Sequence, residues 1–137
     1  MKLRNEILEL IRQEQQRQDG RFVPNEDIYL EKLAAQAELV CHEVRGVCVG
    51  FAFFYCNDAE RQASYVTLLA VAPEARRQGV GSALVHYVLG MTKARGFSVC
   101  RLEAHKGSPA AMRLYEASGF QVVEDRGDKV LLQAVAG

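Results

Sequence analysis

Residues 64–104 constrain the fold most, because they alternate between strand-like and helix-like patterns. An apolar run, SYVTLLAV, is followed by a turn rich in arginine and glycine, and then by a helical pattern from about Val80 to Arg95. A second strand-like run, FSVCRLEA, begins just after Gly96, a typical helix stop. Two strands joined through a helix lie parallel. The nearly continuous apolar first strand is expected to be central, with both faces covered.

The flanking segments predict the remaining elements. Helical spacing indicates a first helix that stops at Gly20, and a second helix is expected to begin at Pro24. ELVCHEV and VCVGFAFFYC around Arg45-Gly46 predict an antiparallel hairpin. Further along, we expect Ser108 to cap a helix that starts at Pro109 and stops at Gly119, and FQVVED and DKVLLQAV to form a last hairpin. The sum is one α/β domain over residues 1–137: a mixed sheet of about six strands with one central parallel pair, and about four helices.

Charge is balanced over the whole chain but not along it. Lys plus Arg and Asp plus Glu each total 17, so no net field attracts nucleic acid or an anionic membrane. Between residues 76 and 113, however, Glu103 is the sole acid among many basic residues. This asymmetry predicts either a local site for a polyanionic ligand or solvated helix faces. No apolar run is long enough to span a membrane.

The four cysteines and three histidines show no metal-ligand spacing, so no metal ion is expected. Cys41 and Cys48 fall diagonally on one face of the expected first hairpin, too far apart for easy bridging. The charged N-terminus does not read as a signal peptide. We therefore expect reduced thiols in a cytoplasmic protein.

The turn APEARRQGVGSAL places arginine and glycine directly before a helix. Free N–H groups at a helix start bind phosphate oxygens, and glycine lets the phosphate approach the backbone. A P-loop would need a lysine after Gly81, where Ser82 stands, and a dinucleotide fingerprint would need glycine or alanine where Leu84 stands. The turn is therefore an anion site of another type, or else a glycine-softened turn with solvated arginines.

Two motifs resemble the GNAT superfamily of acyl-CoA-dependent N-acetyltransferases. Arg76-x-x-Gly79-x-Gly81 matches the family motif that wraps the CoA pyrophosphate. A second family motif is matched by Ala111, Leu114-Tyr115 and Gly119-Phe120. The resemblance is strongest between Val66 and Phe120, and it implies a GNAT-like fold without the family's first strand.

The resemblance implies transfer of an acetyl group from acetyl-CoA to a primary amine by direct attack in a ternary complex. The acceptor is then a small molecule or the N-terminus of a peptide or protein. Both a monomer and a homodimer are compatible with the sequence. A catalytically silent acyl-CoA-binding or regulatory module is the alternative, because Ser108 stands where the family usually has an asparagine and because the family's first strand is missing. The implied acetyl-CoA contacts are Leu69, Ala70, Val71, Arg76, Arg77, Gln78, Gly79, Val80, Gly81, Ser82 and Ser108.

Two residues are candidates for the chemistry. Tyr115 matches the family tyrosine that protonates the CoA sulfur, and its alternative role is core packing. Glu103 matches the catalytic glutamate of the branch that acetylates the N-terminal alanine of a ribosomal protein. It could act as a base, through a water relay, or as a clamp for the substrate ammonium; the alternative is a salt bridge to Arg101 or Lys106. Aromatic residues form either the acceptor floor or core: Tyr29, Phe51, Phe53, Tyr55 and Tyr65.

Overall fold

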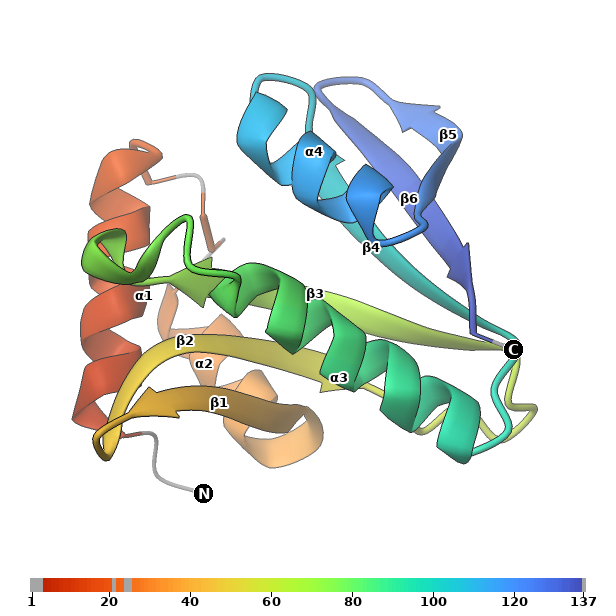
Figure 1. The fold of residues 1–137 in the computed structure, drawn as a ribbon, viewed down its shortest axis with the longest axis horizontal. Helices are drawn as coiled ribbons and strands as arrows, with labels where there is room; N and C mark the ends of the chain where they lie inside the picture. Colours follow the sequence, from red (N-terminus) through yellow and green to blue (C-terminus); the bar gives the residue numbers. More distant parts are fainter. Residues whose placement is uncertain (1–3, 21, 24–25, 137) are drawn as a thin grey trace.

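The structure is a computed structural model that describes residues 4–20, 22–23 and 26–136 (Figure 1). Within these residues the chain forms four α-helices, one short 3-10 turn and six strands. In chain order they are α1 (Asn5–Arg17), α2 (Glu26–Gln36), β1 (Glu38–Val44), β2 (Val47–Tyr55), β3 (Ala63–Val71), η1 (Pro73–Ala75), α3 (Val80–Ala94), β4 (Val99–His105), α4 (Pro109–Ala117), β5 (Gln121–Arg126) and β6 (Lys129–Val135). The expected elements are confirmed, although Pro24, the expected start of α2, lies outside the described residues.

The strands form one mixed sheet in the order β1-β2-β3-β4-β6-β5. Only β3 and β4 pair in parallel among the described strands, as the strand–helix–strand pattern predicts. The first hairpin turns at Arg45 and Gly46, with φ angles of 53° and 81°. Both lie in the left-handed region that a two-residue type I′ turn requires.

The central parallel pair separates partway along its length. Pairing between β3 and β4 ends at Val66 and Leu102, although β3 continues to Val71 and β4 to His105. The register of β3 against β2 skips Thr67, which marks a bulge, and bulges bend and twist a strand. Beyond it the two strands diverge as the arms of a V in Figure 1.

This divergence corrects one expectation. The apolar run of β3 predicts a strand covered on both faces, but only its alternate residues are buried, and those between them stay half-exposed. The strand is central in the sheet, as expected, and the splay leaves part of it facing an opening.

Packing of α3 on the sheet places its N-terminus beside the end of β3. A Cβ added at Gly50 on β2 would lie 2.7 Å from Val80 Cγ1, so a larger residue there would push the helix away. Figure 1 shows α3 in front of the sheet and α2 behind it.

The four cysteines are free thiols, three of them buried. None of the described helices is long and apolar enough to cross a membrane.

Candidate active site

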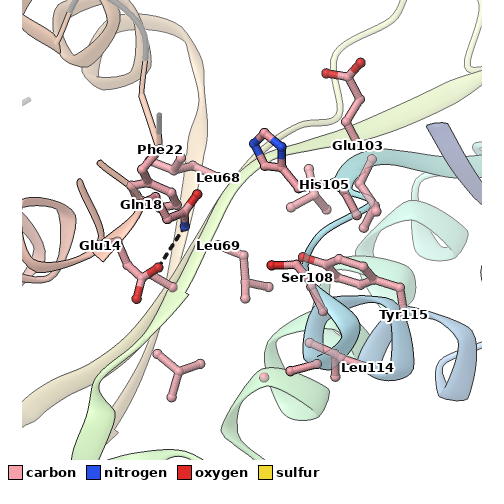
Figure 2. A pocket seen from close by; sticks show the side chains of 18 of the residues that line it. Glu14, Gln18, Phe22, Leu68, Leu69, Glu103, His105, Ser108, Leu114 and Tyr115 are labelled. Carbon is pink, nitrogen blue, oxygen red and sulfur yellow. Dashed lines mark hydrogen bonds between the residues drawn. The ribbon is translucent and has the colours of Figure 1, made fainter. Parts of the chain in front are cut away.

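The splay of β3 from β4 opens a cavity of about 1090 Å³, slightly larger than the roughly 300–1,000 Å³ of typical ligand sites. Its floor is β3. Figure 2 shows Glu14, Gln18 and Phe22 on one side of this strand and Ser108 and Tyr115 on the other. The cavity therefore has two walls that come from distant parts of the sequence.

The floor presents an unpaired strand edge. Leu69, Ala70 and Val71 line the cavity and pair with β2 on one side only, since pairing with β4 has ended at Val66. The Val71 carbonyl accepts one long hydrogen bond, 3.4 Å from Arg76 Nε. Such an edge can pair with an extended ligand that carries amide groups, in the manner of an added strand.

The turn that contains Gly79 and Gly81, here called the glycine turn, exposes backbone groups to the same cavity. Gly79 has a φ of 80° and is the N-cap of α3, and no side chain caps this helix start. Gly79, Val80, Gly81 and Ser82 all line the cavity, which makes the helix start available to an anion. Among the described residues Arg77 has no hydrogen-bond or ion-pair partner, and it lines the cavity too. The Gln78 amide instead donates to the Glu74 carbonyl at 3.2 Å and does not line the cavity.

The second arginine of the turn is engaged. Arg76 Nη2 lies 2.6 Å from Glu14 Oε1, and Glu14 also accepts hydrogen bonds from Arg17 at 2.7 Å and from Gln18 Nε2 at 2.9 Å. Glu14 is only 7% exposed. Burial alone would raise the pKa of Glu14, but the hydrogen bonds from Arg17 and Gln18 and the nearby positive charges hold it below its ordinary value.

Sequence reasoning missed Glu14, although a signal was present. Ile7, Leu10 and Ile11 form the buried stripe of α1, and Glu14 continues that stripe at helical spacing. A carboxylate at a buried position of an amphipathic helix needs partners, and here they come from its own helix and from the glycine turn.

Tyr115 and Ser108 form the opposite wall. Tyr115 is 8% exposed and packs edge-on against Phe120, with ring centroids 5.9 Å apart. Its side chain points toward Ser108 in Figure 2. Burial raises the pKa of Tyr115 to about 12, so the phenol keeps its proton. Ser108 occupies the N-cap position of α4 as expected, but its side chain makes no capping hydrogen bond, and its hydroxyl is left on the cavity wall.

Glu103 lines the cavity and pairs with an arginine that the sequence did not suggest. Its Oε2 lies 3.0 Å from Arg126 Nη1, whereas Arg101 bonds to Gln133 and Lys106 to Asp125. The expected partners of a structural salt bridge are therefore wrong. Burial and the nearby Glu103 charge raise the pKa of Tyr65 to about 12.

The predicted aromatic floor divides into two groups. Tyr29 and Tyr65 line the cavity, and a 2.5 Å hydrogen bond joins the Tyr29 hydroxyl to Thr67 Oγ1 at the bulge. Phe51 and Phe53 are 0% exposed core residues, and Tyr55 does not line the cavity. Two further lining residues, His105 and Lys129, were not anticipated. Within the described part of the chain, no group of three or more His, Cys, Asp or Glu side chains could hold a metal ion.

Comparisons with known proteins agree with this geometry. The profile of the family described as "Acetyltransferase (GNAT) family" matches residues 5–120. The mycothiol acetyltransferase of Parafrankia sp. (strain EAN1pec) is 34% identical over 122 residues, which cover 86% of this chain and 34% of that protein. The [ribosomal protein bS18]-alanine N-acetyltransferase of Escherichia coli K12 is 38% identical over 52 residues, which cover 38% of this chain and 35% of that protein.

Solved structures show the same fold. An acetyltransferase of the GNAT family from Staphylococcus aureus Mu50 has a TM-score of 0.80 at 14% identity, and the match covers 100% of this chain and 98% of that one. By contrast, the chain spans only 24–35% of the length of the curated relatives that it matches.

Proposed function

The chain belongs to the GNAT family of acetyltransferases, and we propose that it transfers an acetyl group from acetyl-CoA to a primary amine. One observation carries the proposal: an unpaired strand edge, an uncapped helix start and a protonated tyrosine all face one cavity.

The residues present fit acetyl-CoA, which supplies an activated acetyl thioester. The bare N–H groups from Gly79 to Ser82, together with the unpartnered Arg77, suit a pyrophosphate. The open edge from Leu69 to Val71 suits the amides of a pantetheine arm, and the Ser108 hydroxyl is free to contact that arm. Arg76 reaches the same turn, but its guanidinium is shared with Glu14.

Each chemical step is assigned to a group of this chain. A backbone N–H on the β3 edge donates to the carbonyl oxygen as negative charge develops on it. Tyr115 holds a proton at its Oη, and gives it to the departing sulfur. We assign the side of the cavity formed by β4 to the acceptor amine. There Glu103 takes a proton from the attacking amine or holds that amine as an ammonium.

The test is a screen of acceptors with free thiol as the signal. Purified protein and acetyl-CoA are mixed with amines, peptides and aminoglycosides, and thiol release is compared with a reaction that contains no acceptor. Release with at least one acceptor is expected. Tight CoA binding without release above background for any acceptor would favour a silent acyl-CoA-binding module.

A further inference from the structure

Two basic side chains stand together, without partners, on the acceptor side of the cavity. His105, the last residue of β4, lies directly opposite Lys129, the first residue of β6, in the antiparallel register. Both are half-buried and both line the cavity. Across the described residues, neither side chain makes a hydrogen bond or an ion pair. Figure 2 shows the His105 ring projecting into the space beside β3.

The two acids that line the cavity, Glu103 and Glu14, do not pair with His105 or Lys129. Glu103 is joined to Arg126 at 3.0 Å, and Glu14 is joined to Arg17 and Arg76. Among the described residues that line this side of the cavity, the side chains without partners are therefore basic. Partly desolvated basic groups without partners are unfavourable unless a ligand satisfies them, and a polycationic acceptor would be repelled here.

The spacing indicates what that ligand looks like. Glu103 and His105 lie on the same face of β4, two residues apart, a separation of about 6.6 Å along the strand. Lys129 is a direct cross-strand neighbour of His105, with about 5 Å between Cβ atoms. An α-amino acid carries its amine and carboxylate on one carbon, so its two charged groups can contact neighbouring side chains on one face of a strand, each through a hydrogen bond of about 2.8 Å.

We propose that the acceptor is a free amino acid whose carboxylate binds Lys129 and His105 while its amine lies at Glu103. This rests on the proposed acetyl transfer and names its substrate class. The acceptor side chain then faces the half-buried aromatic residues Phe22, Tyr29 and Tyr65, which line the same cavity.

The experiment compares free L-amino acids of increasing side-chain size with their amides, which differ only in the charge at the carboxyl carbon. We expect kcat/KM for the preferred acid to exceed that for its amide by about tenfold or more, as for a hydrogen bond between charged groups. Lys129→Gln should abolish this ratio by raising KM for the acid, with kcat little changed. Lys93→Gln, at an exposed lysine of α3 outside the cavity, should keep the ratio.

Each other outcome is decisive. Amides or peptides acetylated as fast as free amino acids would overturn the carboxylate site and indicate a peptide end, while acetyl transfer itself would stand. If no amine is acetylated although CoA binds, the proposed function fails, and calorimetric binding of N-acetyl amino acids and their amides then tests the site alone. Binding of the acid that depends on Lys129 would support the site, and equal or absent binding would overturn it.

Discussion

Arg76 Nη2 and Glu14 Oε1, 62 residues apart in sequence, lie 2.6 Å apart, so that a buried carboxylate of α1 holds an arginine of the glycine turn. The second carboxylate oxygen accepts hydrogen bonds from Arg17 and Gln18. The wall that α1 contributes to the cavity is thereby fastened to the turn before α3. Glu14 is a structural anchor of the cavity, since every donor it uses lies on one of these two segments.

Replacing this anchor should change stability in a pH-dependent way. Glu14→Gln is expected to lower the free energy of unfolding at pH 7 by about 1–2 kcal/mol, because it weakens the hydrogen bonds that the buried carboxylate accepts from the partly exposed Arg17 and Arg76. The pKa of Glu14 is lowered by folding, so its contribution is present above about pH 4.3 and is lost as the pH falls further. Urea unfolding at neutral and acid pH measures this. The deficit should shrink in acid, whereas Glu9→Gln, at a partly exposed position of α1 where Glu9 pairs with Arg12, should change little at either pH because surface ion pairs contribute little.

Arg77 provides the test of the pyrophosphate site. Arg77→Glu should weaken CoA binding by at least about 1.5–3 kcal/mol, because a charge-assisted hydrogen bond is replaced by repulsion. Arg45→Glu is a matched control, since Arg45 is also exposed and also has a left-handed φ, 53° against 64°, but lies in the first hairpin. Calorimetric titration with CoA gives both affinities. Equal affinity of the two variants would exclude Arg77 from the site.

Glu103 and Glu124 allow a catalytic role to be separated from a structural one, because both carboxylates pair with Arg126 at 3.0 Å. Only Glu103 lines the cavity. Either substitution by glutamine should cost no more than about 1 kcal/mol of stability. Glu103→Gln alone should lower kcat/KM for the amine, by about 10²-fold or more for a base. A lower kcat of the Glu103 variant would identify Glu103 as the base, and a higher KM would identify it as the ammonium clamp. Identical kinetics of the Glu103 and Glu124 variants would indicate a purely structural role.

The sequence predicted the parts of the site that depend on local patterns. Gly79 and Gly81 stand where a strand-to-helix turn needs them, and the strand–helix–strand order was sufficient for the parallel pair. The splay was not predictable, because it depends on a bulge at Thr67 that shows only in the pairing of β3 with β2.

Long-range neighbours account for the other differences. Phe53 and Tyr29 could not be assigned to core or cavity before the register and the packing of α2 were known. Lys129 reaches the cavity only because β6, rather than β5, pairs with β4. Glu14 differs from these, since its position on the buried stripe of α1 was visible in the sequence.

Tyr115→Phe removes a hydroxyl and keeps the ring packed against Phe120. Because burial raises the pKa of Tyr115 to about 12, the phenol is protonated at any assay pH below about 10 and can serve as the acid. Turnover with acetyl-CoA should fall by about 10²–10⁴-fold with little change in KM, and an acyl donor whose leaving group needs no proton should restore it. Tyr87→Phe, at a half-exposed tyrosine of α3, should have no effect. Loss without rescue would mean that the hydroxyl positions the sulfur, and full turnover would leave Tyr115 as a core residue only.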